Sequence, residues 1–148
     1  MELLQCNCSS LRGATRALTQ AYDEVLRPSG LRMTQFSILA RVAAVGPMRV
    51  NELAELLVMD RTTLGRNIQP LEREGFVVLE VGSDRRERLI KLAPAGRRVL
   101  SRAMVLWNGV HQRFESKFDV LEAKALRDTM KLIVKIGREL SSENATEA

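Results

Sequence analysis

The amino-acid sequence predicts a mainly α-helical protein with one small β-hairpin. Along most of the 148 residues, apolar side chains recur at intervals of three and four, which is the period of helices that bury one face. Between residues 76 and 92 this period changes. Residues 76–81 form an apolar, β-rich run, and residues 88–92 alternate polar and apolar side chains, as a half-exposed strand does.

The first half of the chain predicts three helices. The first buries one apolar stripe, formed by Leu11, Ala14, Leu18, Tyr22 and Val25. It is expected to end at the helix breakers of residues 27–30. Thr34 is a candidate N-cap for the second helix, which ends at residues 46–47. A short third helix follows over about residues 51–58.

The fourth helix has a clear start and two distinct faces. Asp60 can cap it, because a carboxylate accepts hydrogen bonds from the open amides of a first turn. Its inward residues are Leu64, Ile68 and Leu71, and its outward residues are Arg61, Thr62, Gly65, Arg66 and Gln69. Pro70 has no amide to donate to the helix, so we expect a bend or an early end there.

The hairpin and two long helices complete the chain. Residues 82–87 form a charged, turn-rich loop between the two expected strands. Pro94 fits the first turn of the next helix, whose apolar stripe is Leu100, Met104, Trp107, Val110, Phe114 and Phe118. Asp119 and Glu122 have the spacing of a capping box for the last helix. Residues 141–148 are polar and are expected to fray.

Composition excludes several classes of function. One histidine, His111, weighs against His-based catalysis and metal cages, and six scattered aromatics weigh against a platform for single-stranded bases. There is no glycine-rich phosphate loop and no nucleophile elbow. We therefore expect no enzyme activity, no cofactor and no assigned metal. The sequence shows no apolar run of membrane-spanning length and no secretory signal, so we expect a soluble, cytoplasmic protein.

Three helices followed by a hairpin describe a winged helix-turn-helix, which suits double-stranded DNA. A helix about 10–12 Å across fits a major groove about 12 Å wide. Short or forked side chains in its first two turns then reach the base edges, here Thr62, Thr63, Arg66 and Asn67. The loop could insert Arg86 into the minor groove. The chain's whole net charge of +5 is also matched by the excess of basic over acidic residues within 84–102.

The flanking helices suggest a dimer. The first helix and the last two each carry an apolar stripe that one small winged domain would not cover. Packing of these helices on one another within one chain is the alternative, but we favour a shared homodimer interface that sets two recognition helices one DNA turn apart. The expected organisation is an N-terminal segment and dimerisation helix over 1–30, a DNA-binding region over 31–93, and dimerisation helices with a polar tail over 94–148. Together they would form one intertwined domain.

A series of short segments in a fixed order resembles one known family. They are residues 31–39, 52–57, 60–66, 71–77, the wing residues 84–86, and residues 92–96. In this order the segments resemble the MarR family of transcriptional regulators, and the resemblance runs from about residue 11 to residue 140. It implies a homodimer on near-palindromic promoter DNA, often a repressor released by a small-molecule effector or by oxidation.

The resemblance also implies roles for individual residues. Thr62, Thr63 and Arg66 would read the major groove and Arg86 the minor groove, while Asp84 would orient the wing arginine. The full candidate DNA-binding set is Arg61, Thr62, Thr63, Arg66, Asn67, Asp84, Arg85 and Arg86.

Three positions depart from the family pattern. Gly65 stands where a hydroxyl residue is common, at a cost of about 1 kcal/mol of helix propensity relative to alanine. Arg49 replaces a common threonine before the third helix, where a contact with phosphate is expected. Ala93 replaces a threonine that would cap the helix starting at Pro94. The operator sequence therefore stays unpredicted.

The pair Cys6 and Cys8 is the one feature that bears on the signal. Spacing of two places both sulfurs on the same side of an extended segment, but not of a helix. Three interpretations stay open: inert residues of the terminus, exposed thiolates that form a disulfide on oxidation, or a soft metal site shared by two chains. His111, Trp107 and Phe114 are expected in the core or an interface, and the two aromatics could also line an effector pocket.

Two other classes of function compete with a DNA-binding regulator. A winged helix can serve as a protein-interaction module, and the cysteines could make the chain a thiol-based metal or redox sensor. The exposed Thr62, Arg66 and Arg86 suit phosphates and bases better than an apolar partner surface. A salt-dependent loss of binding would identify DNA as the partner, because each neutralised phosphate releases counterions.

Overall fold

The computed structural model describes residues 6–146. Residues 1–5 and 147–148, the outer ends of the expected N-terminal segment and C-terminal tail, lie outside the described residues. The chain divides into two compact units with a boundary after Val110. We call residues 6–110 the winged unit and residues 111–146 the tail unit, and each is described by itself.

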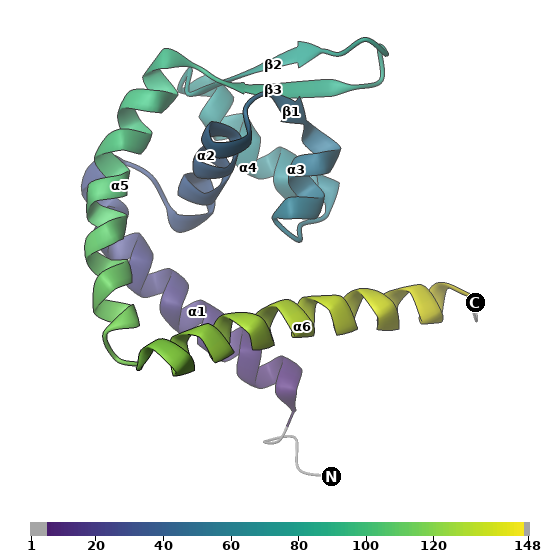
Figure 1. Ribbon diagram of the computed structural model, residues 1–148. Coiled ribbons are helices and arrows are strands. Elements are labelled where there is room, and N and C mark those ends of the chain that lie inside the picture. The colour runs from purple at the N-terminus through teal and green to yellow at the C-terminus, as the bar shows by residue number, and fades with distance from the viewer. Residues whose placement is uncertain (1–5, 147–148) are drawn as a thin grey trace. The chain divides into compact units, whose positions relative to one another are not determined.

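The winged unit contains most of the elements (Figure 1). In order they are α1 (Asn7–Leu26), the 3-10 turn η2 (Arg27–Ser29), α2 (Met33–Val45), β1 (Met48–Arg49), α3 (Val50–Leu56), α4 (Arg61–Arg73), β2 (Val77–Val81), β3 (Arg88–Leu92) and the larger part of α5 (Pro94–Glu115). The tail unit holds the end of α5 and all of α6 (Val120–Thr146). These elements confirm a mainly helical chain with a small β wing. None of the described helices has the length and apolar character needed to cross a membrane.

The sheet has one strand more than expected. Its order is β1-β3-β2, and both pairings are antiparallel. Ile90 in the central strand pairs with Leu79 of the hairpin on one side and with Met48 on the other. The expectation of a two-stranded hairpin was therefore incomplete, because a strand of two residues is too short to show a period in sequence.

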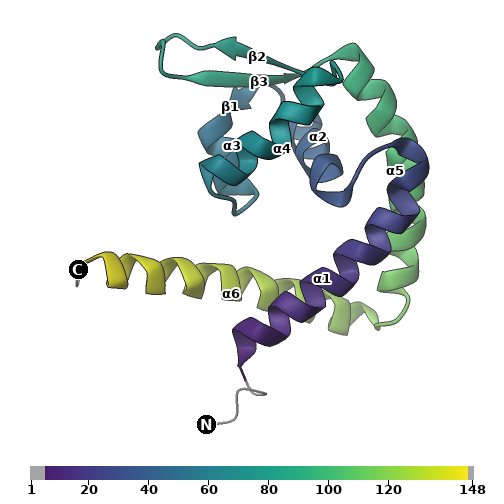
Figure 2. The ribbon, with the colours of Figure 1, turned by 180° about the vertical axis from the view of Figure 1, so that it is seen from behind.

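The core of the winged unit lies between the sheet and the helices. Figure 2 shows α4 beneath the hairpin, beside α2 and α3. The side chains with no exposed surface include Leu26, Ile38, Leu39, Leu53, Leu64, Leu71 and Ile90. Each fully buried side chain of this size stabilises the fold by about 1.5–3 kcal/mol. The inward face expected for α4 is confirmed, since Leu64, Ile68 and Leu71 are all buried.

The start of α2 differs from the expectation, because Arg32 and not Thr34 is the N-cap residue. Two side chains other than that of the cap residue accept hydrogen bonds from the backbone amides at this helix start. The Met33 amide donates to Asp23 Oδ1 of α1 at 2.6 Å, and the Arg32 amide donates to Gln35 Oε1 at 3.0 Å. A partner ten residues away thus fixes where this helix begins.

The helix α4 does not end early at Pro70 but continues to Arg73. Pro70 lies in the last turn, so the chain loses one helical hydrogen bond, to the carbonyl of the exposed Arg66, which water can satisfy. The expected end at residues 74–75 is confirmed. Gly75 adopts a φ of 69°, the left-handed conformation that glycine favours at a helix end.

The last helix begins as expected and ends later. The Asp119 amide donates to Glu122 Oε2 at 2.9 Å, and the Glu122 amide donates to Asp119 Oδ1 at 2.8 Å, which confirms the capping box. Fraying from residue 141 was a wrong expectation, because α6 runs to Thr146. The Ser141 hydroxyl donates back to the carbonyl of Gly137 at 2.9 Å, so this polar side chain bonds within the helix.

The junction between the sheet and α5 depends on one glycine. A Cβ atom added to Gly96 would lie 2.1 Å from the carbonyl oxygen of Phe76. The same oxygen accepts a hydrogen bond from the Ala93 amide at 3.0 Å. The absent side chain of Gly96 therefore lets α5 pack directly against the strand backbone.

Candidate nucleic-acid interface

The first turn of α4 is built around Asp60. Its Oδ1 accepts the Thr63 amide at 2.8 Å, and its Oδ2 accepts the Thr63 hydroxyl at 2.6 Å. The hydroxyl and amide bonds from Thr63 hold the pKa of Asp60 below its usual value of 3.8. The carboxylate therefore stays ionised at neutral pH and fixes the helix start that the sequence predicts.

The candidate base-reading residues of α4 fall into two groups. Thr63 already donates its hydroxyl to Asp60, and the Asn67 side-chain amide donates to the Thr63 carbonyl at 2.8 Å. Arg61, Thr62 and Arg66 are exposed, and the described residues give them no hydrogen-bond or ion-pair partner. The freely available donors at the start of α4 are therefore these three side chains, while Thr63 and Asn67 are partly committed to the helix itself.

The wing loop between β2 and β3 is ordered by its own backbone and by Asp84. The Arg86 amide donates to Asp84 Oδ1 at 2.9 Å, the Glu87 amide donates to the Asp84 carbonyl at 2.9 Å, and the Gly82 amide donates to the Glu87 carbonyl at 3.0 Å. Arg85 and Arg86 are exposed at the tip. Asp84 thus contacts the backbone of Arg86, and its role in orienting the arginine side chain stays a prediction.

A groove of about 520 Å³ runs between α3, α4 and the wing. Its lining includes Arg49, Gly65, Gln69, Leu79 and Arg86. No atom would lie within 4 Å of a Cβ added to Gly65, so this departure from the family pattern leaves open space in the groove. The groove thus brings the middle of α4 and the wing residues Arg86 and Arg88 to one surface.

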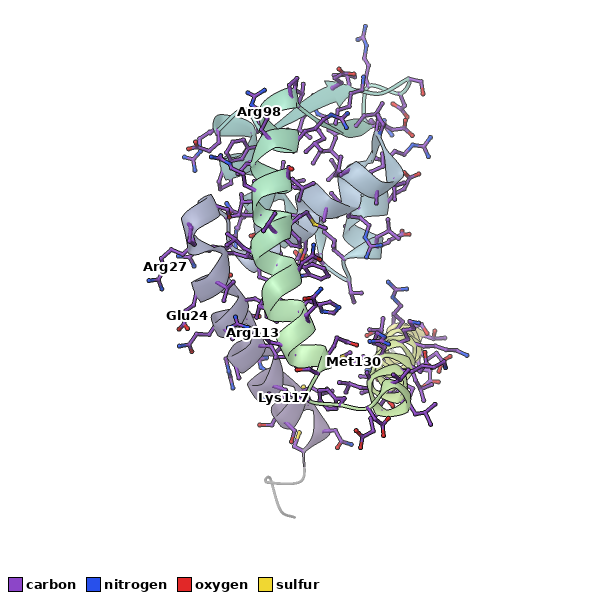
Figure 3. All side chains as sticks on the ribbon, turned by 60° about the vertical axis from the view of Figure 1, so that its left-hand side comes forward. Glu24, Arg27, Arg98, Arg113, Lys117 and Met130 are labelled. Atoms are coloured by element: carbon purple, nitrogen blue, oxygen red, sulfur yellow. The ribbon has the colours of Figure 1, made fainter. Side chains whose placement is uncertain are left out.

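The basic segment 84–102 does not form one patch. Arg85, Arg86 and Arg88 belong to the wing, whereas Arg98 lies on the first turns of α5 (Figure 3), beyond the whole length of β3. Lys91 pairs with Glu80 across the hairpin. Of the basic residues in this segment, Arg86 and Arg88 line the groove beside α4.

Arg49 and Glu87 are two interface residues that sequence reasoning did not pair. Arg49 Nε lies 3.1 Å from Glu87 Oε1, and Arg49 Nη1 lies 3.8 Å from Glu52 Oε1. Arg49 thus contacts two carboxylates in this structure, and its expected contact with phosphate stays a prediction. No local pattern could reveal a pair of residues that the sheet brings together from distant parts of the chain.

Two further hollows lie on the winged unit, away from the wing. A groove of about 720 Å³, lined mostly by polar and charged residues, follows α1 and the residues before α2, where Glu24 and Arg27 project from the surface (Figure 3). A smaller hollow of about 290 Å³ is lined mainly by Leu18, Tyr22, Met33 and Trp107. The Trp107 ring stacks on Phe36 with 5.7 Å between centroids. Trp107 thus packs against the core and also lines a hollow, whereas Phe114 lies in the tail unit against Phe118. A role in binding an effector stays a prediction.

The cysteine pair straddles the start of α1. Cys6 is the N-cap residue with extended backbone, and Cys8 lies within the first turn. Both thiols are free and exposed. The segment is therefore neither fully extended nor fully helical, and its redox or metal role stays a prediction.

The sequence has relatives among transcriptional regulators. The sequence profile of the MarR family matches residues 29–87. An uncharacterized HTH-type transcriptional regulator of Bacillus subtilis, YwoH, is 34% identical over 79 residues, which cover 53% of this chain and 58% of that relative. An uncharacterized HTH-type regulator of Bacillus cereus is 27% identical over 124 residues, covering 82% of this chain and 80% of the relative.

Solved structures resemble the fold over nearly its whole length. The M. tuberculosis transcriptional regulator MosR, in complex with DNA, is 35% identical with a TM-score of 0.85, and the match covers 92% of this chain and 98% of MosR. A mutant of E. coli MarR complexed with operator DNA has a TM-score of 0.79 over 90% of this chain and 99% of that one. Its 20% identity supports the fold alone.

Proposed function

The chain belongs to the MarR family of HTH-type transcriptional regulators, and from this premise we propose that it is a homodimeric, sequence-specific repressor that binds promoter DNA. Membership of this family also agrees with the expectation of a regulator rather than an enzyme. MosR, 35% identical to this chain, was solved in complex with DNA. The operator, the homodimer and the signal that releases the protein from DNA are what we propose for this chain.

The observation that carries the proposal is the set of exposed, unpartnered cationic and hydroxyl side chains at the start of α4. Arg61, Thr62 and Arg66 project from the first two turns of a helix whose N-terminus also favours phosphate. Arginine forms two parallel hydrogen bonds with guanine in the major groove. The wing then supplies Arg86 for the minor groove, where a narrow A·T tract concentrates negative potential.

The tail unit supports the homodimer. Among the described residues 111–146 only Ala123 is buried, while Val120, Leu121, Leu132, Ile136 and Leu140 are exposed. Apolar residues in successive turns of one helix stabilise a protein only when another surface covers them. A second copy of the chain would cover them and place two copies of α4 on two half-sites of a near-palindromic operator.

Binding to the protein's own upstream DNA tests the proposal. Fluorescence anisotropy would compare that duplex with a scrambled duplex of equal length at several salt concentrations. We expect preference for the upstream duplex and a steep fall of affinity with salt. Arg66→Ala should weaken binding by about 1–3 kcal/mol. Arg73→Ala, at the other end of α4, is the matched control and should leave the preference unchanged.

Two results would contradict this function. Equal and weak binding of both duplexes, with no difference between the two arginine variants, would favour a protein-interaction module. A monomer at micromolar concentration would contradict the dimer while leaving DNA binding to be judged by the anisotropy. The assay and the oligomeric state thus answer separate questions.

The release signal is either a small molecule or thiol oxidation. Peroxide would oxidise the thiols of Cys6 and Cys8 to a disulfide and be reduced to two molecules of water. In that case peroxide should weaken DNA binding by the wild type but not by the protein with Cys6→Ser and Cys8→Ser. An effector in the hollow beside Trp107 should instead quench indole fluorescence and weaken DNA binding in both proteins. An unchanged peroxide response in the double variant would exclude the cysteines as the sensor.

A further inference from the structure

The base of the wing loop contains a close packing contact. A Cβ atom added to Gly82 would lie 2.9 Å from Glu87 Cβ and 3.0 Å from Glu87 Oε2. The Glu87 side chain therefore lies directly over Gly82, at the point where the Gly82 amide donates to the Glu87 carbonyl. Glu87 closes the loop with its side chain as well as its backbone.

Arg49 holds the outer end of this carboxylate. Its Nε lies 3.1 Å from Glu87 Oε1. Arg49 is itself fixed on two sides: it pairs with Leu89 in the sheet, and its amide donates to Glu52 Oε2 at the start of α3 at 3.1 Å. The ion pair thus joins the wing loop to a residue whose backbone is held by β3 and by the start of α3.

We propose that Arg49 is a positioning residue for DNA binding, which clamps Glu87 and so holds the wing loop, with Arg86 beside it, at a fixed orientation to α4. This inference rests on the proposed function. The clamp reduces the number of orientations that the loop samples before binding, so less conformational freedom is lost when Arg86 enters a groove. Arg49 acts through Glu87 and touches no base itself.

The direction in which DNA affinity changes when the charge of Glu87 is removed distinguishes a positioning role from simple electrostatic repulsion. Glu87 is a carboxylate that lines the same groove as Arg86 and Arg88, so removing its charge should strengthen DNA binding if repulsion of phosphate were its only effect. If Glu87 positions the loop, the same change should weaken binding. The pair is partly exposed, with 51% of the Arg49 and 27% of the Glu87 side chain accessible, so it contributes little to the stability of the fold.

Hydrogen exchange tests the clamp without DNA. The variants are Glu87→Gln and Arg49→Met, and the matched control is Glu80→Gln, which breaks the ion pair with Lys91 on the same hairpin. We expect the amides of residues 82–87 to exchange several-fold faster in the two clamp variants, while the control leaves them near the wild-type rate. Equal loop protection in all four proteins would overturn the clamp.

Binding to the upstream duplex tests its consequence. Glu87→Gln should bind about fivefold more weakly than Glu80→Gln, although both variants lose one negative charge. Replacing the A·T pairs that flank the two half-sites by G·C pairs should weaken the control but have little further effect on Glu87→Gln. Tighter binding by Glu87→Gln than by the control would overturn the positioning role. If the wild type itself prefers no duplex, the proposed function fails, and the exchange rates still decide whether the clamp exists.

Discussion

The winged unit and the tail unit differ in how they bury their apolar residues. The hydrophobic core cluster lies wholly within residues 26–103, where the sheet and five helices supply apolar side chains to one interior. In the tail unit, large apolar residues of α6 such as Leu121 and Leu132 are exposed. The winged unit therefore has its own stabilising interior, whereas α6 has an apolar face that a further surface must cover.

The two regions differ in their charges as well. Along the tail unit, Lys124 and Lys131 contact Asp128, and Arg127 contacts Glu115. The ion pair with Lys124 also holds the pKa of Asp128 below its usual value. In the winged unit the guanidinium groups of Arg61, Arg66 and Arg86 form no ion pair with the described residues. The paired charges of the tail unit keep its helix surface hydrated, whereas the unpaired arginine side chains of the winged unit are available to bind phosphate.

We expect the largest effect from a substitution that disrupts the packing of the winged unit. Gly96→Ala would force a methyl group against the Phe76 carbonyl, so we expect the free energy of unfolding to fall by about 3 kcal/mol or more. Urea denaturation followed by circular dichroism measures this. Gly109→Ala in the same helix, where no atom lies within 4 Å of the added Cβ, is the control and should change stability by no more than about 1 kcal/mol.

A second change tests whether the tail unit needs a partner surface. Leu132 and Ile136 are 54% and 44% exposed on successive turns of α6. Changing both to lysine should raise the dimer dissociation constant by at least about 100-fold, because two apolar side chains would no longer be buried. Sedimentation velocity measures the association, and alanine at Lys131 and Lys135 provides the control on the charged side. A dimer of unchanged stability would contradict the proposed interface.

A smaller effect is expected from relieving backbone strain in the winged unit. Val58, in the turn between α3 and α4, has a φ of 53°, which a β-branched residue rarely adopts. Its side chain is 57% exposed, so little packing is lost on replacement. Val58→Gly should raise the free energy of unfolding by about 0.5–1 kcal/mol through relief of strain. Val45→Gly, at the last residue of α2 with 59% exposure, replaces a residue that needs no left-handed backbone and should lower it, by up to a similar amount. A loss of stability in both variants would show that the turn is unstrained.

The smallest effect concerns acid stability at Asp60. Because folding lowers the pKa of this carboxyl, its contribution is present above its unfolded pKa and is lost as pH falls through the folded value. Asp60→Ala should therefore unfold more easily at neutral pH and lose part of the decline in stability below pH 3.8. Asp60→Asn keeps an acceptor for the Thr63 amide and should stay near the wild type at neutral pH. Thermal melts between pH 2.5 and 7 measure both, and parallel curves for all three proteins would contradict the role of the charge.

The features that could be predicted from the sequence alone are local ones. A helical period, a breaker and a capping residue lie within a few positions of one another, so they could be recognised before any fold was known. Asp60 and the pair Asp119 and Glu122 were identified this way, as were the inward residues of α4. The exposed Thr62 and Arg66 followed from the same period, and the order of the segments then indicated the family.

Contacts between segments that are distant in the sequence became visible only in the tertiary structure. Met48 became a strand residue because Ile90 lies beside it, and Asp23 of α1 fixed the first amide of α2. The Arg49 and Glu87 pair likewise depends on the sheet. The free energy of such contacts depends on which surfaces meet, and a period or a motif carries no information about a partner far away in the chain. The sequence therefore predicted which side chains could bind DNA, and the fold decided how they are held.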